Sequence, residues 1–388
     1  MKIAIVGNGI CGITAARLIS ENSPGAKISI FTDEEYNYYP RPLLDRLLSE
    51  TMDLNQLFPY NDEWYKKRGI DVFLKTRVVE IPRDYDKVLI TTGASPFVPP
   101  IEGIKSEEVF TCRNIADVLR IRAFARGKKR AVVIGGGLLG LETAKALTDR
   151  GLKVTVIEHN SRLLPKQLDE EGGQILKSRI EKLNIEVVLQ VTCDRIMTEG
   201  AKTCLLSKQI GKLEADLFIV SAGVRSNIEL ARNCGIGIEK GIVVDKYMKT
   251  SCDRIYAAGD CAEFNGMVYG IIPAAIEQGT VAASNMIDKP LEYKGTTFQA
   301  TLKVMGIDLT SIGAVNPEGE GYETVCRKDA PKGIYRKCII KDGRLIGAIV
   351  LGEKDGIAGL TRIIKEGIYV TGNKDALLGG EAALTEWA

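Results

Sequence analysis

Histidine and excess charge are both scarce in this 388-residue sequence, and each shortage excludes a class of function. The single histidine, His159, is too few for a histidine-rich metal site and leaves little room for a catalytic triad. A net charge of +2 predicts no overall attraction to nucleic acid or to an anionic membrane. No apolar run approaches the roughly 18 residues of a membrane-spanning helix, and the chain opens on a strand without a leader, so we expect a cytoplasmic protein.

Cysteine is present, but its nine copies are scattered singly along the chain. No two have CxxC or metal-ligand spacing, and an odd number fits reduced thiols better than a disulfide framework. We therefore expect no metal and assign the chemistry mainly to a bound cofactor. The nine are Cys11, Cys112, Cys193, Cys204, Cys234, Cys252, Cys261, Cys326 and Cys338.

Two glycine-rich fingerprints lie about 130 residues apart. GNGICG at residues 7–12 and GGGLLG at residues 135–140 each follow a short apolar strand and precede a helical pattern. In this GxGxxG spacing the glycines allow a tight turn and let the backbone approach a pyrophosphate at a helix N-terminus. One such motif is weak evidence, but two predict two bound dinucleotides. That combination is typical of a flavoprotein that takes hydride from a nicotinamide nucleotide.

The residues after the first fingerprint suit a flavin nucleotide. Asp33 and Glu34 end the second strand about 21 residues after the fingerprint, where an acid accepts hydrogen bonds from an adenosine ribose, and the sequence does not decide between them. Arg41 could make a forked contact with the pyrophosphate. Arg46 could lie near the flavin ring, where a cation stabilises the reduced form. The alternative for Asp33 and Glu34 is a solvated acidic turn, and the alternative for Arg41 and Arg46 is a surface ion pair.

The second fingerprint is also followed by an acid. Glu158 ends a strand 18 residues after the last glycine of this fingerprint, where a carboxylate accepts from the 2′-hydroxyl of NAD and repels the 2′-phosphate of NADP. His159 and Arg162 are the nearby groups that could offer positive charge to a phosphate instead. We expect Glu158 to dominate, NADH to be the substrate, and His159 to be a solvent-facing loop residue.

Further strand ends run into turns that fit a two-nucleotide fold, at residues 88–94, 219–227 and 250–260. The last of these delivers Gly259 and Asp260 beside a cofactor chain, where the carboxylate can accept from a ribityl hydroxyl. Beyond residue 295 we expect short strands and one helix but find no legible chemistry. From Gly379 onwards the sequence fits either a loosely held tail or a partner contact.

These features resemble the pyridine nucleotide–disulfide oxidoreductase superfamily. The resemblance covers residues 1 to about 290 strongly, through the fingerprints, TTG at 91–93, AGD at 258–260 and EQG at 277–279. Within the superfamily, YPRPLL at 39–44 and the aromatic stretch 57–65 look most like NADH:rubredoxin oxidoreductases and the flavin domain of NADH-dependent nitrite reductases.

The resemblance implies an α/β fold with two Rossmann-like dinucleotide-binding domains, glutathione-reductase-like, and a small C-terminal α/β domain. The FAD-binding domain would comprise residues 1–104 and 246–294, the NAD-binding domain 105–245, and the C-terminal domain 295–388. Glu142 would approach the nicotinamide, the alternative being a carboxylate favoured by the helix dipole. The positions implied to line the cofactors are Gly7, Gly9, Gly12, Asp33, Glu34, Arg41, Pro42, Thr92, Gly93, Gly135, Gly137, Gly140, Glu158, Gly223, Gly259, Asp260 and Gln278.

The sequence departs from its disulfide-reducing relatives. Those carry a CxxxxC pair or a lone cysteine in the segment that is here 39–46, whereas no cysteine occurs between Cys11 and Cys112. Asp45 and Arg46 also stand where flavin reductases that serve iron–sulfur proteins often have serine and lysine. Hydride that reaches this flavin therefore has no dithiol to pass to.

We expect an FAD-dependent oxidoreductase that takes hydride from NADH and passes electrons to a small carrier. Rubredoxin is the first expectation for that carrier and a ferredoxin-like iron–sulfur protein the second. The alternatives are an NADH oxidase, a disulfide or polysulfide reductase, and an electron-input or regulatory subunit of a larger redox complex. The sequence leaves open whether the protein is a monomer or a homodimer.

Overall fold

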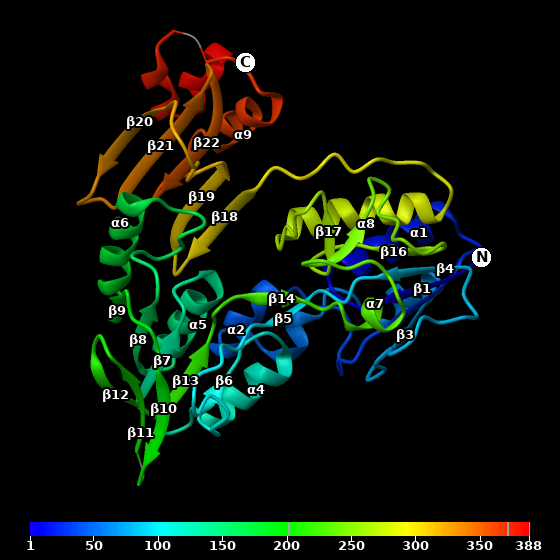
Figure 1. Ribbon diagram of the computed structural model, residues 1–388, viewed down its shortest axis with the longest axis horizontal. Helices are drawn as coiled ribbons and strands as arrows, with labels where there is room; N and C mark the ends of the chain where they lie inside the picture. The colour runs from blue at the N-terminus through cyan, green and yellow to red at the C-terminus, as the bar shows by residue number, and fades with distance from the viewer. Residues whose placement is uncertain (201, 371, 388) are drawn as a thin grey trace. The chain divides into compact units, whose positions relative to one another are not determined.

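The structure is a computed structural model that describes residues 1–200, 202–370 and 372–387 (Figure 1). The chain packs as two compact units, and each takes its residues from three separate stretches. The first unit comprises Met1–Leu44, Met52–Ser95 and Val224–Thr296, and the second comprises Asp45–Thr51, Pro96–Gly223 and the chain from Thr297 onwards. The domain boundaries expected from the sequence stay a prediction, because packing does not show what each unit binds.

The first unit is built on a five-stranded parallel sheet of order β16-β4-β1-β2-β3. Its strands are rich in β-branched residues. The strands β16, β4, β1 and β2 are largely buried on both faces, as parallel strands covered by helices are, whereas the edge strand β3 is partly exposed. Figure 1 shows α1 and α8 side by side over this sheet, and the two helices pack closely. The elements are β1 (Lys2–Val6), α1 (Ile10–Asn22), β2 (Lys27–Phe31), β3 (Ile70–Phe73), β4 (Lys87–Ile90), β16 (Ile255–Ala257) and α8 (Ile272–Met286).

Shorter elements complete this part of the chain. The strand β5 pairs with β14, and β15 pairs with β17 in parallel. The short elements are η1 (Arg41–Leu43), η2 (Leu54–Leu57), α3 (Asp62–Lys67), β5 (Ala94–Pro96), β14 (Val224–Ser226), α7 (Glu229–Asn233), β15 (Ile242–Val244) and β17 (Ala262–Phe264).

The second unit repeats the parallel design, with the order β6-β13-β7-β8-β9. An antiparallel meander, β10-β11-β12, precedes β13 in the chain. Most of α2 also belongs to this unit, because Glu50, two residues after that helix, forms ion pairs with Arg122 and Arg150. The elements are α2 (Leu44–Leu48), β6 (Val109–Phe110), α4 (Ile115–Phe124), β7 (Arg130–Ile134), α5 (Leu138–Asp149), β8 (Lys153–Glu158), α6 (Glu170–Glu181), β9 (Ile185–Leu189), β10 (Arg195–Glu199), β11 (Lys202–Ser207), β12 (Gly211–Ala215) and β13 (Leu217–Val220).

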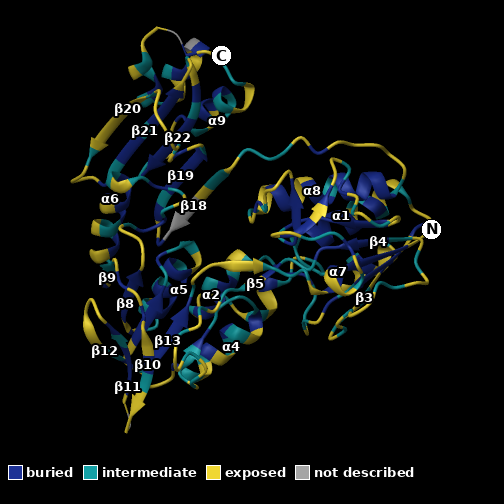
Figure 2. Cartoon of the chain, in the orientation of Figure 1, coloured by how far each residue is buried: buried dark blue, intermediate teal, exposed yellow. Residues whose placement is uncertain are grey.

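The C-terminal part of the second unit is an antiparallel sheet of order β18-β19-β22-β21-β20. The helix α9 packs on it, and Figure 2 shows β21 and β22 buried while the edge strand β20 is largely exposed. The elements are β18 (Gln299–Val304), β19 (Ile307–Gly313), β20 (Tyr322–Asp329), β21 (Ile334–Lys341), β22 (Arg344–Leu351), α9 (Ile357–Glu366), η3 (Lys374–Leu378) and η4 (Glu381–Trp387).

The segment after Gly379 corrects one expectation. Leu384 and Trp387 are buried in the same apolar cluster as Leu360 and Ile363 of α9, so the described end of the chain is part of a core and the loose-tail alternative is wrong. Among the described helices, none is both long and apolar enough to cross a lipid bilayer.

Candidate dinucleotide-binding sites

The first fingerprint forms a turn in which each glycine has a different reason to be there. Gly7 has φ +117°, and a Cβ on it would lie 2.2 Å from the carbonyl oxygen of Thr91 on the neighbouring strand. A Cβ on Gly12 would lie 2.2 Å from the carbonyl oxygen of Gly7, so this glycine lets α1 pack onto its own turn. A Cβ on Gly9 would meet no atom within 4 Å. The outer glycines therefore serve packing, whereas the middle one faces open space.

The second fingerprint repeats this geometry. Gly135 has φ +118°, and its Cβ would lie 2.2 Å from the carbonyl oxygen of Ser221. The Cβ of Gly140 would lie 2.1 Å from the carbonyl oxygen of Gly135, and that of Gly137 would again meet nothing within 4 Å. Two turns with the same contacts and the same open middle position are what a pair of pyrophosphate sites requires.

The helix that leaves each turn begins without a competing anion. Gly9 is the N-cap of α1 and Gly137 that of α5, neither provides a side-chain cap, and neither first turn contains an acidic residue. The first N–H groups of a helix have no partner within it and carry the positive end of the helix dipole. Both helix N-termini are thus suited to an anion.

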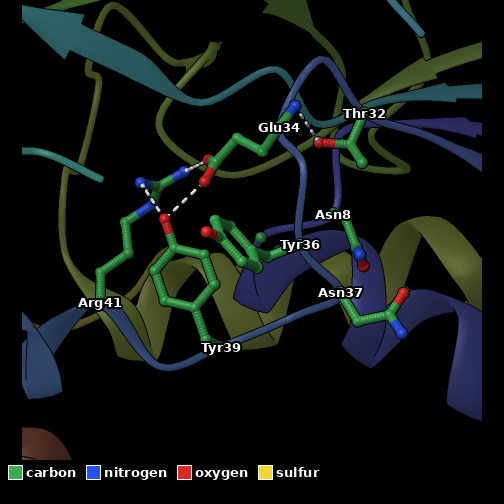
Figure 3. A pocket seen from close by; sticks show the side chains of 8 residues that line it. Asn8, Thr32, Glu34, Tyr36, Asn37, Tyr39 and Arg41 are labelled. Carbon is green, nitrogen blue, oxygen red and sulfur yellow. Dashed lines mark hydrogen bonds and ion pairs between the residues drawn. The ribbon is translucent and has the colours of Figure 1, made fainter. Parts of the chain in front are cut away.

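A small, partly open pocket lies beside the first turn, and Figure 3 shows its lining. Glu34, Tyr39 and Arg41 point toward one another there: the Glu34 carboxylate accepts from Arg41 Nη2 and from Tyr39 Oη, each at 2.5 Å. Asp33, in contrast, is exposed and does not line the pocket. The lining residues are Asn8, Gly9, Thr32, Glu34, Tyr36, Asn37, Tyr39 and Arg41.

Asn8, inside the fingerprint, has polar atoms without a partner. Both amide atoms are buried, and neither completes a hydrogen bond with a described residue, although the amide approaches the Tyr65 hydroxyl. A buried amide with no bond is costly unless something else provides one. The pocket therefore fits a polar ligand that contacts the fingerprint.

Asp260 and Gln278 are brought to the same turn from the second half of the chain. Burial raises the pKa of the Cys11 thiol, and the charges of Cys261 and Asp260 add to that rise. Burial lowers the pKa of Arg41, but Tyr39, Glu34 and Asp260 more than offset this, so its pKa is raised. Gln278, buried in α8, accepts from the Gly259 N–H at 2.8 Å. Gly259, at φ +82°, in turn packs on Cys11 of α1. The structure thus brings these sequence-predicted residues together around the first fingerprint.

Asn227 fixes the turn that contains Thr92 and Gly93. Its amide Nδ2 donates to the Thr92 carbonyl at 2.8 Å, its own carbonyl accepts from Thr92 Oγ1 at 2.8 Å, and its N–H donates to the Gly93 carbonyl at 2.9 Å. Sequence reasoning noted the stretches 39–44 and 219–227 but gave Tyr39 and Asn227 no role of their own, because their partners cannot be read from a local motif.

Glu158 lies under the second fingerprint turn. Its Oε2 accepts from the Gly136 N–H at 2.6 Å, and its Oε1 accepts from the backbone N–H and side-chain amide of Asn160 at 2.8 and 2.6 Å. Neighbouring cations are directed elsewhere: Arg162 donates to the carbonyls of Leu168 and Pro165, and exposed His159 contacts Thr192. Glu158 is thus the main charged group at this strand end.

Glu142, in α5, has an unusual electrostatic environment. Burial, together with the nearby carboxylate of Asp45, raises its pKa to about 7. Burial likewise raises the pKa of the Cys112 thiol to about 12, and Asp45 and Glu142 add to that rise. Because of this raised pKa, Cys112 is a poor nucleophile at neutral pH.

Asp45 and Arg46 both belong to the second unit, whereas Arg41 belongs to the first.

The described residues give no sign of a metal centre or of a redox-active disulfide. Within the described ranges, no three histidine, cysteine or acidic side chains gather as metal ligands. All nine cysteines are free, and burial raises the pKa of Cys11 and Cys261, which lie near the first fingerprint.

Comparison with known proteins places these turns in a family. Residues 1–279 match the pyridine nucleotide-disulphide oxidoreductase family, and residues 299–368 match the rubredoxin NAD+ reductase C-terminal domain. The chain is 34% identical over 91% of its length to the assimilatory nitrate reductase electron transfer subunit of Bacillus subtilis, and 31% identical over 97% to the nitrite reductase (NADH) large subunit of Escherichia coli. It spans about half of these relatives' lengths, 48% and 47%.

The fold agrees with that assignment. The crystal structure of NADH:rubredoxin oxidoreductase from Clostridium acetobutylicum matches with a TM-score of 0.79 at 25% identity, covering 99% of both chains. The expected superfamily and fold class are therefore confirmed. On the family match over residues 1–279, this chain belongs to the pyridine nucleotide-disulphide oxidoreductases.

Proposed function

We propose that the protein is an FAD-dependent oxidoreductase that takes hydride from NADH and passes electrons to a small one-electron carrier, with rubredoxin the first expectation. The observation that carries the proposal is the repeated fingerprint turn, in which two helix N-termini each face open space at a middle glycine. Members of this family bind FAD and NADH. When bound, FAD supplies the exchange between the two-electron nicotinamide and a one-electron carrier.

The first unit has the residues that FAD requires. The N–H groups at the start of α1 would bind the pyrophosphate together with Arg41. Glu34 would accept from the adenosine ribose, because it lines the pocket and Asp33 does not. Tyr39 holds the Glu34 carboxylate in position. Asp260 would accept from the ribityl hydroxyls. Pro42, Thr92, Gly93 and Gln278 would line the remaining part of the site.

The second unit has the residues that NADH requires. The start of α5 would bind its pyrophosphate and Glu158 its adenosine ribose. Arg162, the nearest candidate for contact with a 2′-phosphate, is held by two backbone carbonyls. This arrangement supports NADH over NADPH. Glu142 would lie toward the nicotinamide, and Gly223 in the turn beyond β13.

Two observations support a carrier protein as the electron acceptor: the low reactivity of the thiols and the identity of the C-terminal domain. A disulfide or persulfide reductase of this family needs a reactive cysteine, whereas Cys11 and Cys112 have raised pKa values and low thiolate character. The match of residues 299–368 to the rubredoxin reductase C-terminal domain favours a small iron–sulfur carrier. One specific observation favours a second candidate, the electron-input part of a larger reductase, because a relative at 34% identity is an electron transfer subunit twice as long.

Anaerobic NADH-driven reduction of rubredoxin tests the proposal. The FAD-loaded protein is mixed with NADH and either rubredoxin, oxygen or a disulfide at matched concentrations, and the rate of each reduction is compared. Rubredoxin reduced much faster than the other two supports the proposal. Flavin bleaching by NADH without transfer to rubredoxin refutes the carrier and favours the electron-input role, and a preparation that retains no FAD refutes the cofactor.

A further inference from the structure

The loop that follows Glu158 is folded back onto the second fingerprint turn. The Leu164 N–H donates to the carbonyl of Gly136 at 3.1 Å, while Glu158 accepts from the N–H of the same glycine. Leu164 is almost fully buried and has φ +48°, a backbone conformation that residues other than glycine rarely adopt. Both polar groups of the Gly136 backbone are therefore held by residues 158–164, so the loop and the Glu158 carboxylate contact the same glycine.

The far end of the loop is held by the C-terminal domain. Asn316, just after β19, donates through Nδ2 to the carbonyls of Pro165 at 3.1 Å and Leu168 at 3.0 Å. Arg162 donates to the same two carbonyls, through Nη2 at 3.4 Å and Nε at 2.9 Å, and its Nη1 forms an ion pair with Glu170 at 3.5 Å. The Asn316 amide thus shares its two acceptors with Arg162, which is the only arginine in the described loop after Glu158.

A second contact joins the loop end to β21. Asp169, the N-cap of α6, accepts through Oδ2 from the Tyr335 hydroxyl at 2.7 Å and from Lys337 Nζ at 2.8 Å. Tyr335 is 1% exposed, so this contact is shielded from solvent. The loop is consequently held at Pro165, Leu168 and Asp169 by residues that lie 148 to 168 positions further along the chain.

We propose that the C-terminal domain is a specificity element for the nicotinamide nucleotide, with Asn316 as its positioning residue. By bonding to Pro165 and Leu168, Asn316 keeps the loop closed, keeps Glu158 against the fingerprint, and keeps Arg162 turned toward the loop carbonyls. Removing this amide loosens the loop and frees the guanidinium to reach a 2′-phosphate. The inference rests on the proposed function, since it takes Glu158 as the acid that binds the NADH ribose.

The test compares Asn316→Ala with Asn373→Ala in the full-length, FAD-loaded protein. Asn373 is a matched control, because it is also an exposed asparagine of the C-terminal domain, and its side chain makes a local bond, accepting from the Asp375 N–H at 3.2 Å. Ferricyanide serves as the acceptor, so that the NADH reaction is measured independently of the natural carrier. KM and kcat are determined for NADH and for NADPH.

We expect Asn316→Ala to raise KM for NADH about three- to tenfold, the range set by one or two lost hydrogen bonds, and to leave kcat within about twofold. KM for NADPH should fall, and adding Arg162→Ala should abolish that gain. Hydrogen exchange should accelerate at the amides of Leu164 and Leu168. Tyr335→Phe, which removes only the hydroxyl bond to Asp169, should give the same changes to a smaller extent.

Two results would separate failure of this inference from failure of the proposed function. If Glu158→Ala weakens NADH binding but Asn316→Ala alters neither KM nor the NADH-to-NADPH ratio, the inference is wrong and the proposed function stands. If Glu158→Ala itself leaves NADH binding unchanged, the ribose assignment fails and the inference fails with it. Equal changes in Asn316→Ala and Asn373→Ala would mean a general loss of stability and would also overturn the inference.

Discussion

Valine at the middle glycine of each fingerprint should separate cofactor binding from folding. A Cβ on Gly9 or Gly137 meets nothing within 4 Å, so the folded chain has room for the side chain, but that room is where a pyrophosphate would lie. Gly9→Val should therefore fold and lose FAD. Gly137→Val should retain FAD and bind NADH at least about 100-fold more weakly, which is about 2.7 kcal/mol.

Alanine at the last glycine of each fingerprint should do the opposite. The new Cβ would lie 2.2 Å from a carbonyl oxygen in Gly12→Ala and 2.1 Å in Gly140→Ala, well inside ordinary van der Waals contact, so the helix must move. Overpacking of this kind costs about 1–3 kcal/mol of unfolding free energy. At about 2–4 °C per kcal/mol, Tm of the affected unit should fall by roughly 2–12 °C.

The assay for all four variants is the visible absorbance of retained flavin, thermal unfolding of the cofactor-free protein, and KM for NADH with ferricyanide. The decisive result is the crossed pattern. Fully yellow Gly9→Val protein would refute the FAD site at α1, and loss of FAD from Gly137→Val with unchanged NADH binding would mean that the two nucleotides are assigned to the wrong units. Equal Tm losses in the valine and alanine variants would refute the packing argument.

Three further predictions follow from the two sites. Glu158→Ala should raise KM for NADH about tenfold and relax the discrimination against NADPH, since the carboxylate no longer accepts from one or repels the other; an unchanged ratio of kcat/KM would move the determinant elsewhere. Arg41→Lys keeps the charge but loses the fork, so the FAD dissociation constant should rise about tenfold in titrations of the cofactor-free protein, and an unchanged constant would contradict a pyrophosphate role. Because the folded-state pKa of Glu142 is raised to about 7, the folded protein binds its proton more tightly than the unfolded chain, and stability should fall as pH rises from roughly 4.5 to 7. Glu142→Gln should flatten that slope and gain about 1–2 kcal/mol at pH 8 in denaturant titrations of the cofactor-free protein, a figure that allows for partial exposure; an unchanged slope would refute the raised pKa.

The sequence was informative where structure is determined locally. A strand, a glycine turn and a helix within about 20 residues form a pattern that does not depend on the rest of the chain, and both fingerprints have this structure. The helix α1 begins at Ile10, directly after its N-cap Gly9, so the last glycine of the fingerprint, Gly12, lies within the helix.

Choices that depend on distant residues could not be made from the sequence. Asp33 and Glu34 are equivalent in spacing, and only the bonds that Tyr39 and Arg41 make with Glu34 distinguish them. The motif around Arg46 did not reveal that this residue packs in the second unit. The ion pairs of nearby Glu50 in that unit are made with Arg122 and Arg150, which lie far along the chain. Asn316 carries no motif, since its partners are backbone carbonyls.

The discontinuity of the first unit also determines when during synthesis it can bind a cofactor. Its sheet needs β16 at Ile255–Ala257 as an edge strand, and its fingerprint needs Gln278 of α8, so it cannot be completed until nearly three hundred residues have left the ribosome. The parallel sheet of the second unit lies within residues 109–220 and can form while the first is still open. The growing chain should thus form first the sheet that we propose binds the nicotinamide nucleotide, and FAD should be loaded late, after the first sheet has closed.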